Sequence, residues 1–508
     1  MLKFADRLIK SVEDSDHPFY YYLFVFVFSI IVRNFLEVFA YDEIKISSWY
    51  AHLHYSTYYL ALITWFVVII SALTKQKIDS VYKVVFTFIP VIIICPIIDL
   101  VVLHAFDLKQ TLGYLSPELH GAFFSKYFTY FGNSIGVNLN IQNVFKPNMG
   151  PSMGYRLEVL FVLIGFGFYF YSKTKTVFKT FVAILVSYTL IYFFCSTPYV
   201  ISLITRPYSP QLVPYYLFLL FIGLVLIFVM RFPKQAKIVF KDFRWLRLGY
   251  FELLFIFGAV YGLTKGGVFK LSILYNGIFA MIAIAMAWKH AVVTNNMVDI
   301  EIDKISNPER PLFSESISQN FYSNLAWVVF AIALIYAIYS SLLTFTFILI
   351  FMMNYFIYSA PPLRLKRVTV LSKLPIAINS LLLVLLGAQY VGYDIMQIGW
   401  KIPAFILGAG TVILNIIDLK DYEGDKSAGI KTLPVVIGLK PAKFWMAVLV
   451  LSAYLFSFIF MKNNAAYFIL IGVGVLQFIA INRKNYSDSL VISLMLLSIL
   501  IGISEKFI

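Results

Sequence analysis

Three polar residues at one end of an apolar segment have the types and the spacing to do chemistry. Asn295, Asp299 and Asp303 stand four residues apart, directly after an apolar run that predicts a helix over 271–294. Residues four apart lie on one face of a helix, about 6 Å further along its axis at each step. Carboxylates at the edge of a lipid bilayer are costly unless a cation neutralises them. The stripe is therefore predicted to bind a counter-charge.

A second acidic group follows another apolar run, in the segment NIIDLKDYEGDKSAGIKTLP. It contains Asp418, Asp421 and Asp425, and the last two are again four residues apart. Two facing carboxylate stripes supply the hard oxygen ligands that suit Mg²⁺ held together with substrate phosphates. We therefore predict a metal site formed by Asp299, Asp303, Asp418, Asp421 and Asp425. The alternative is that both groups only form salt bridges at helix ends, which two separate stripes disfavour.

Basic and hydroxyl side chains near the two stripes are candidates to bind a diphosphate, because Arg contacts phosphate through two donors and Lys acts as a point charge. Pro361 and Pro362 end a predicted helix over 342–360, so the residues that follow hang over the site. The predicted diphosphate-binding residues are Arg310, Tyr358, Ser359, Arg364, Lys366, Lys420, Lys426 and Lys431. Arg367 and Lys373 are left out, because a basic loop that only sets membrane orientation explains them equally well.

The composition identifies the elements that position these residues. Of 508 residues, 60% are hydrophobic and 13% charged, which excludes a soluble globular enzyme, a disordered tail and a fibrous repeat. The apolar runs predict an all-α polytopic membrane protein with about fifteen transmembrane helices, one of them over 84–105. Cys95 and Cys195 both lie in apolar runs, which excludes a disulfide framework.

The net charge of +15 arises from 41 Lys and Arg against 26 Asp and Glu. Most of the basic residues fall in alternate loops, which is the pattern that sets membrane orientation and not one that indicates nucleic-acid binding. We expect a cytoplasmic N-terminus, no cleavable signal peptide, and a site that faces the cytoplasm. Membrane lipids are the expected surroundings.

A basic, aromatic-rich stretch divides the chain. We predict a six-span N-terminal module of unknown role at 1–230, a basic cytoplasmic linker at 231–247 and a nine-span domain at 248–508. The long loop at about 106–154 is expected to face outward.

The residues of the nine-span domain resemble the signatures of the UbiA superfamily of intramembrane prenyltransferases. The first signature, N-x-x-x-D-x-x-x-D, is similar to Asn295–Asp303, and Asn307-Pro308-Glu309-Arg310-Pro311-Leu312 looks like the family's N-x-x-R-P-L. The second, D-x-x-x-D, is similar to Asp421–Asp425 with the following Gly429 and Thr432-Leu433-Pro434. The run from Tyr358 to Leu363 looks like the chlorophyll-synthase and related branches. Asn296 stands where many members carry Asp, and Asp418 is an additional acid.

The resemblance implies transfer of an isoprenoid chain from a prenyl diphosphate to a lipophilic or aromatic acceptor, with Mg²⁺ held by both acidic motifs. It assigns catalysis to Asn295, Asp299, Asp303, Asp421 and Asp425, with Asn295 orienting substrate, and it leaves the residue that removes the proton unnamed. A developing negative charge on a leaving diphosphate is stabilised by metal ions and fixed cations, so the physics agrees. One alternative is a UbiA-type cyclase that uses no acceptor. An alternative of another class is a cation-coupled lipid carrier.

The first six spans resemble no family, but their polar residues gather toward the outward side. They are Arg33, Glu37, His52, His54, Asp99, His104, Arg156 and Glu158. Arg33 and Glu37 are four apart and are predicted to pair. Three interpretations stay open: a structural salt-bridge network, an outward pocket for a lipid headgroup or second reaction, and a His/Asp metal site.

Overall fold

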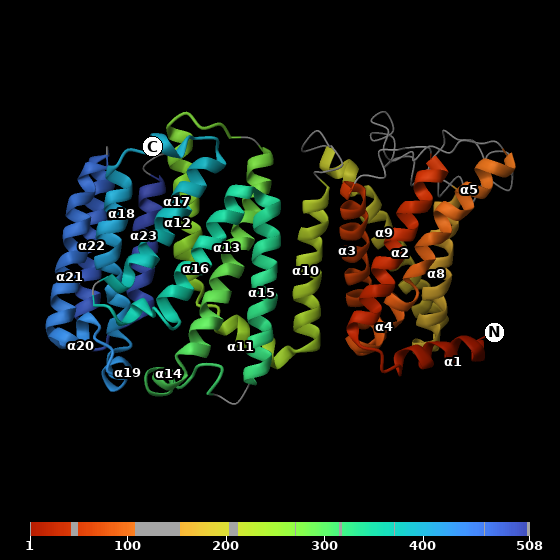
Figure 1. Ribbon diagram of the computed structural model, residues 1–508, viewed down its shortest axis with the longest axis horizontal. Helices are drawn as coiled ribbons and strands as arrows, with labels where there is room; N and C mark the ends of the chain where they lie inside the picture. The colour runs from red at the N-terminus through yellow and green to blue at the C-terminus, as the bar shows by residue number, and fades with distance from the viewer. Residues whose placement is uncertain are drawn as a thin grey trace. The chain divides into compact units, whose positions relative to one another are not determined.

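The computed structural model describes residues 2–41, 49–106, 153–202, 212–269, 271–313, 317–369, 371–461 and 463–504. Within these ranges the chain forms helices and no strand (Figure 1). Among the described residues, thirteen helical segments are long and apolar enough to cross a membrane, and the 17-residue helices α17 and α23 are apolar but shorter. The protein is therefore an integral, multi-pass membrane protein, as its composition predicts. Most of the long predicted loop at 106–154 lies outside the described residues.

The chain divides into two compact units, Met1–Pro233 and Lys234–Ile508. The first unit contains α1 (Leu2–Glu13), α2 (Phe19–Tyr41), α3 (Trp49–Thr74), α4 (Ile78–Thr87), η2 (Ile89–Ile93), α5 (Ile94–Phe106), α8 (Met153–Thr174), α9 (Val177–Ser202) and α10 (Val213–Arg231). The division falls inside the predicted linker 231–247, most of which forms α11 (Pro233–Lys241) and the turn before the next helix.

The predicted helix over 84–105 is not a single straight helix. The chain leaves the α-helical conformation after α4, passes through the 3₁₀ turn η2 with Pro90 in its first turn, and resumes as α5. Proline lacks the backbone N–H that a helix interior requires, so Pro90 and Pro96 explain the interruption. Hydropathy detects the span but not its break.

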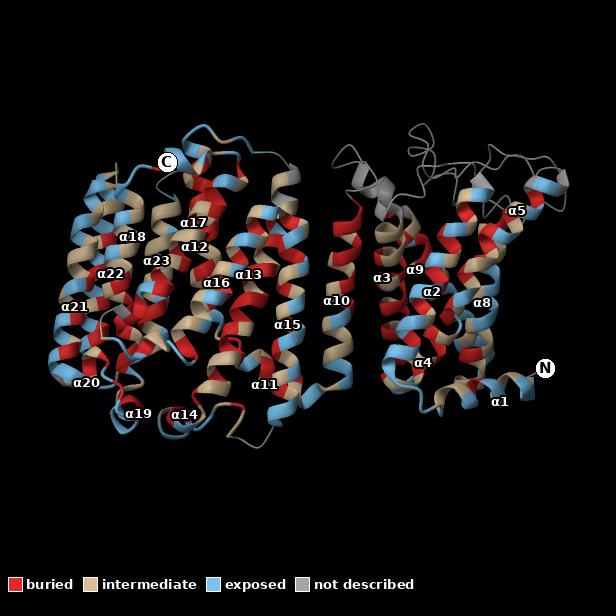
Figure 2. Ribbon diagram, in the orientation of Figure 1, coloured by how far each residue is buried: buried red, intermediate tan, exposed pale blue. Residues whose placement is uncertain are grey.

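The second unit contains the acidic and basic residues that the sequence analysis predicts to form an active site. Its helices are α11 (Pro233–Lys241), α12 (Trp245–Thr264), α13 (Leu271–Val298), α14 (Ile300–Ser306), α15 (Gln319–Ser340), α16 (Leu342–Ser359), η4 (Leu365–Arg367), η5 (Leu371–Lys373), α17 (Leu374–Tyr390), η6 (Ile395–Gln397), α18 (Lys401–Ile413), η7 (Leu414–Leu419), α19 (Tyr422–Ser427), α20 (Leu433–Ile437), α21 (Leu439–Phe456), η8 (Ser457–Ile459), α22 (Asn464–Asn482) and α23 (Asp488–Ser504). Buried residues of this unit concentrate on α13 and α17 (Figure 2). Large exposed apolar side chains such as Trp327 and Phe468 cover outer faces, where lipid is the expected neighbour.

Glycines allow α12 and α17 to pack backbone against backbone. A Cβ atom at Gly258 would overlap the carbonyl group of Val384, and one at Gly387 would overlap the carbonyl group of Phe255. Small residues at such crossings are the usual means of close helix packing in membranes. These contacts hold α12 against α17, and both helices contribute side chains to the pocket described below.

We expect Gly258→Ala to destabilise the second unit by about 1–3 kcal/mol, because the helices must separate to admit the methyl group. Thermal unfolding of the purified protein in detergent measures the effect. Gly472→Ala on α22 is the matched control, since a Cβ atom there meets nothing within 4 Å. Equal unfolding temperatures for the two variants would contradict the packing argument.

Candidate active site

The first acidic segment crosses a helix boundary without losing its register. α13 ends at Val298, and Asp299 (φ −98°, ψ 21°) precedes the short helix α14. The backbone N–H of Asp299 still donates to the Asn295 carbonyl at 2.9 Å, and that of Asp303 donates to the Asp299 carbonyl at 2.9 Å. Because these bonds continue the helical pattern, Asn295, Asp299 and Asp303 all reach one pocket.

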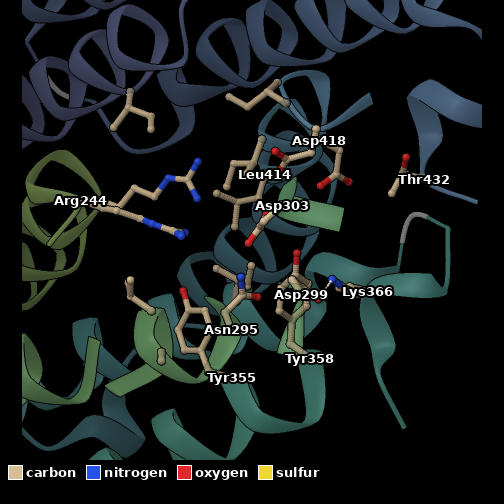
Figure 3. A pocket seen from close by; sticks show the side chains of 18 of the residues that line it. Arg244, Asn295, Asp299, Asp303, Tyr355, Tyr358, Lys366, Leu414, Asp418 and Thr432 are labelled. Carbon is tan, nitrogen blue, oxygen red and sulfur yellow. Dashed lines mark hydrogen bonds and ion pairs between the residues drawn. The ribbon is translucent and has the colours of Figure 1, made fainter. Parts of the chain in front are cut away.

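The second acidic segment lines the same pocket. The helix α18 tightens into the 3₁₀ turn η7, which carries Asp418, and the chain then continues through Asp421 into α19, which carries Asp425. All three carboxylates line the pocket that the first segment lines. Figure 3 shows Asp299, Asp303 and Asp418 directed into this common space.

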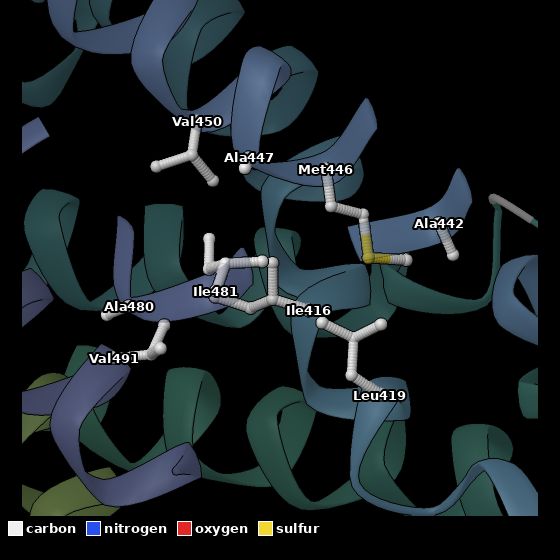
Figure 4. Close-up of a cluster of buried hydrophobic side chains, with 9 residues drawn as sticks. All are labelled: Ile416, Leu419, Ala442, Met446, Ala447, Val450, Ala480, Ile481 and Val491. Atoms are coloured by element: carbon white, nitrogen blue, oxygen red, sulfur yellow. The ribbon is translucent and has the colours of Figure 1, made fainter. Parts of the chain in front are cut away.

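An apolar cluster fixes the second segment in place. Ile416 and Leu419 of η7 pack among Met446 on α21, Ile481 on α22 and Val491 on α23 (Figure 4). The positions two residues before and one residue after Asp418 are thus buried against three helices. The carboxylates therefore stand on a packed turn and not on a loose loop, which limits the conformations they can adopt.

Asn307 joins the two acidic segments directly. α14 packs against α19, and the Asn307 side-chain amide donates to Asp303 Oδ1 at 3.3 Å and to Asp421 Oδ1 at 3.1 Å. The residue is 1% exposed. It continues the four-residue spacing of Asn295, Asp299 and Asp303, a signal by which the sequence could have identified it as a site residue.

Cations already hold the carboxylates of the first segment. The Arg364 guanidinium donates to Asp299 Oδ1 at 2.9 Å, and the Lys366 ammonium contacts the same oxygen. The Arg310 guanidinium forms an ion pair with Asp303. Ser359 donates to Asn295 Oδ1 at 2.9 Å. The structure thus brings these four predicted diphosphate-binding residues to the acidic stripe, and Tyr358 lines the pocket.

Lys373, which the sequence analysis left out of the diphosphate-binding residues together with Arg367, is not among the residues that line the pocket, but it contacts two residues that do. Its ammonium lies 2.5 Å from Asp418 Oδ1 and donates to the Tyr358 hydroxyl at 2.9 Å, and the residue is 1% exposed. A Lys at the start of a helix opposes the helix dipole. Its place directly before α17 was therefore a signal that a specific acidic partner exists.

Lys420, Lys426 and Lys431 are exposed and do not line the pocket. The reason is the spacing of the acidic residues. Asp421 and Asp425 occupy one face of the short helix, so Lys420 and Lys426 project from other faces. Lys426 instead stacks over the Tyr422 ring, 5.7 Å from its centroid.

The second acidic segment carries more negative charge than its cations neutralise. Burial, followed by the neighbouring Asp418 and Asp421 carboxylates, raises the pKa of the Asp425 carboxyl to about 7. Asp418 Oδ2 is buried and accepts no hydrogen bond. A divalent cation would neutralise the surplus negative charge and would give the buried Asp418 oxygen a partner. Carboxylates are the ligands that Mg²⁺ prefers. The residues present therefore fit such an ion, although no three acidic, His or Cys side chains converge as a ready-made metal cage within the described residues.

A polar network that the sequence analysis did not predict supports the pocket from the turn between α11 and α12 and from α13 and α15. Asn296 donates to the Tyr322 hydroxyl at 2.9 Å and accepts from Arg244 at 2.7 Å. Asp242 accepts from Tyr322 at 2.5 Å and pairs with the buried Lys289 ammonium at 3.0 Å. Because the Asn296 amide both donates and accepts, an Asp at this position could not make the same bonds. Sequence alone does not show which distant side chains meet in such a network.

Aromatic and aliphatic groups close the rest of the pocket. Phe251, Trp288 and Tyr355 form one wall, with Phe251 in ring contact with each of the other two. A second, apolar cavity of about 320 Å³ shares Tyr250, Leu414 and Met495 with the acidic pocket. A polar head and a long apolar chain of one ligand could therefore be held at the same time.

The fold and the pocket define a class: a helical membrane domain with acidic and basic groups arranged to bind a phosphorylated, lipophilic substrate. Residues 253–499 match the UbiA prenyltransferase family. This part of the chain is a UbiA prenyltransferase family domain, and the protein is a prenyltransferase.

Individual proteins and a solved structure are similar to this part of the chain. A digeranylgeranylglyceryl phosphate synthase of Thermococcus gammatolerans is 27% identical over 197 residues, which are 39% of this chain and 67% of the relative. The chloroplastic chlorophyll synthase of Avena sativa is 31% identical over 173 residues, 30% of this chain and 42% of its own. A solved UbiA homolog from Archaeoglobus fulgidus, bound to DMAPP and Mg²⁺, is 19% identical and aligns with 53% of this chain and 98% of its own, with a TM-score of 0.43.

We expect Asn307→Leu to lower the affinity for Mg²⁺ or the turnover about 10- to 100-fold, the usual effect of removing a residue that orients metal ligands. The reason is that Asp303 and Asp421 lose their common donor. Turnover of a prenyl diphosphate measured against Mg²⁺ concentration shows the effect. Glu309→Gln, at an exposed position two residues away, is the control. A Mg²⁺ dependence and turnover equal to the native protein's would contradict the bridging role.

Proposed function

We propose that the second unit transfers an isoprenoid chain from a prenyl diphosphate to an acceptor in a Mg²⁺-dependent reaction at the cytoplasmic side of the membrane. One observation carries the proposal: two acidic segments more than a hundred residues apart in the sequence line one pocket and are joined by Asn307. This arrangement disfavours the alternative in which each stripe only forms salt bridges at its own helix end.

The acidic residues would hold the metal. Asp299, Asp303, Asp418, Asp421 and Asp425 are the proposed ligands, and Mg²⁺ would supply positive charge to the leaving diphosphate. The Archaeoglobus fulgidus homolog is bound to Mg²⁺ and DMAPP, with which this assignment agrees.

The cations in the pocket are proposed to exchange partners when substrate binds. Arg364 and Lys366 contact Asp299 in the structure, and Arg310 contacts Asp303. Burial lowers the pKa of the Lys366 ammonium, although Asp299 opposes this effect, and burial followed by the nearby Arg244 charge lowers the pKa of Arg310 to about 10. A diphosphate offers these partly desolvated cations more negative charge than one carboxylate does. They are therefore placed to stabilise the charge that develops as the diphosphate leaves.

The apolar parts of the pocket suit the allylic cation and the isoprenoid chain of the substrate. The wall of Phe251, Trp288 and Tyr355 excludes water and presents ring faces, which attract the positive charge of an allylic cation. The adjoining cavity past Tyr250 and Met495 is the proposed site of the isoprenoid chain.

Arg244 indicates the class of acceptor. It lines the pocket and donates a hydrogen bond to the neutral Asn296 amide, whereas Arg247 is paired with the Asp488 carboxylate at 2.9 Å. We propose that Arg244 binds an anionic group of the acceptor, such as a phosphate. Relatives named digeranylgeranylglyceryl phosphate synthase accord with this choice.

We expect Arg244→Gln to raise the KM for a phosphate-bearing lipid acceptor about tenfold or more, because a hydrogen bond to a charged group contributes about 1.5–3 kcal/mol. The KM for the prenyl diphosphate should change much less. Steady-state kinetics with each substrate varied in turn separate the two effects. An equal rise in both constants would contradict an acceptor-specific role.

The test of the function is direct. Purified protein is incubated with labelled geranylgeranyl diphosphate and Mg²⁺, with and without a glyceryl phosphate lipid acceptor, and both diphosphate release and labelled lipid are measured. We expect acceptor-dependent product that EDTA abolishes and added Mg²⁺ restores. Mg²⁺-dependent diphosphate release with a cyclised hydrocarbon and no acceptor would favour the cyclase alternative. No Mg²⁺-dependent consumption of several prenyl diphosphates would favour the lipid carrier.

A further inference from the structure

The first unit contains a long cavity that the proposed transfer reaction does not use. It encloses about 300 Å³ between α1, α3, η2 and α8. Its lining follows α8 from Tyr155 to Tyr169, a rise of about 20 Å. Nine of its lining residues are aromatic: Tyr58, Tyr59, Phe66, Phe88, Tyr155, Phe161, Phe166, Phe168 and Tyr169. The length and lining suit an extended apolar chain.

One end of the cavity is polar. Glu158 lines it, and its carboxylate accepts from Arg33 at 2.8 Å and from the Tyr59 hydroxyl at 3.3 Å. Tyr155 and Tyr58 also line this end, and their hydroxyls contact Cys195 Sγ at 2.6 and 3.2 Å. An ionised carboxylate has about four acceptor positions, so Glu158 can accept a further hydrogen bond from a ligand.

The charges at this end exclude an anionic headgroup. Arg33 is engaged by Glu158, by Glu37 at 3.0 Å and by the Ile92 carbonyl group. Neither Lys nor Arg is among the described residues that line the cavity, and Glu158 is the one charged side chain there. A phosphate would meet a carboxylate and no lining cation here, whereas Arg244, Arg310 and Lys366 line the pocket of the second unit.

The opposite end is closed by the amphipathic helix α1. Ala5, Leu8 and Ile9 line the cavity, and α1 lies across the ends of the spans that it contacts (Figure 1). Glu13, its last residue, accepts from the Tyr169 hydroxyl at 2.9 Å and pairs with Lys173 at 2.5 Å. The cavity thus has an apolar end under α1 and a hydrogen-bonding end at Glu158.

We propose that this cavity binds a long-chain isoprenoid lipid with an uncharged hydroxyl head, such as a prenyl alcohol or a prenylated phenol. The isoprenoid chain lies along α8, and the hydroxyl group of the head donates a hydrogen bond to the Glu158 carboxylate. The pair of Arg33 and Glu37 was predicted from its spacing, and this site gives the buried salt bridges a role, because Arg33 holds the Glu158 carboxylate that lines the cavity. The His/Asp metal site finds no support, since no metal-binding group of three such residues occurs in the described part of the chain.

Photo-crosslinking to the full-length protein in detergent tests the site. The probes are geranylgeraniol with a diazirine near the end of its chain, the same probe as its diphosphate, and diazirine-labelled palmitic acid. Labelled peptides are mapped by mass spectrometry, and unlabelled geranylgeraniol serves as competitor. We expect the alcohol probe to label α3, η2 or α8 of the first unit at least about tenfold more than either anionic probe, because each anion would be desolvated beside Glu158.

A cavity-filling variant makes the test specific. Gly165 lines the cavity, and a Cβ atom there meets nothing within 4 Å, so Gly165→Phe should abolish the competable labelling. Leu160→Phe, on the same helix but at a position 49% exposed and outside the lining, should keep it. Equal labelling by the three probes, labelling unaffected by Gly165→Phe, or no competable labelling of native protein in these helices would overturn the proposal. The competition experiment uses native protein, so it can overturn the proposal even if Gly165→Phe misfolds. Prenyl transfer is measured separately, so its presence or absence does not decide this test.

Discussion

Replacing Asp299 by Asn is expected to lower prenyl diphosphate turnover by about 10³-fold or more. The substitution keeps the size of the side chain but removes the charge that holds Arg364 and Lys366 over the pocket, and it removes a proposed metal ligand. Preorganised charges that act on a leaving group usually account for losses of this size. Diphosphate release from labelled geranylgeranyl diphosphate at saturating Mg²⁺ measures the effect.

Glu301→Gln is the matched control for this prediction. Glu301 lies two residues away on α14, is exposed and does not line the pocket. Glu301→Gln therefore removes one negative charge close to Asp299 but changes no residue of the pocket. We expect native turnover from Glu301→Gln. Should Asp299→Asn keep more than a tenth of native turnover while Mg²⁺ is still required, the first acidic segment would not hold the metal.

The acidic segments could be located from the sequence because their chemistry is periodic. Asn295, Asp299 and Asp303 keep the four-residue spacing across the boundary between α13 and α14, since the backbone hydrogen bonds continue through Asp299. A pattern defined by local spacing survives such a boundary. Asn307 extends the same pattern by one step, but its neutral amide does not mark it as a metal ligand.

Partners that meet across the fold could not be predicted in the same way. Lys373 pairs with Asp418, which is 45 residues away, and Asp242 pairs with Lys289, which is 47 residues away. Counting basic residues in loops treats Lys373 and Arg367 alike, because both obey the orientation rule. Burial separates them, and burial depends on how α17 packs against its neighbours. The same limit explains why exposed Lys420 and Lys426 were selected together with Lys366.

Hydropathy predicted the membrane spans but not their internal geometry. The prolines of the third span were visible in the sequence, yet whether they kink or break it depends on what re-satisfies the freed backbone groups. The lipid-facing and packed faces were not separable either. Helices such as α15 and α16 carry no charged residue on any side, so a hydrophobic stripe does not identify the core in this protein.

Removing the charge of Lys373 is expected to have the largest effect on stability. Lys373→Met preserves the length of the side chain but leaves the Asp418 carboxylate buried without its cation. Breaking a buried ion pair at one partner usually costs about 3–5 kcal/mol. Chemical or thermal unfolding in detergent, followed by tryptophan fluorescence, should show the loss. Arg367→Met, an exposed position in the same loop, should unfold like the native protein.

A double variant separates the ion pair from general damage to the loop. When both members of a buried pair are replaced by apolar residues of similar volume, the cost is often small. Lys373→Met combined with Asp418→Leu should therefore unfold closer to the native protein than Lys373→Met alone does. It should still lack activity, because Asp418 is a proposed metal ligand with a buried oxygen that accepts no hydrogen bond. If the double variant is no more stable than the single one, the pair does not determine the stability of this turn, and Lys373 acts through its bond to Tyr358 instead.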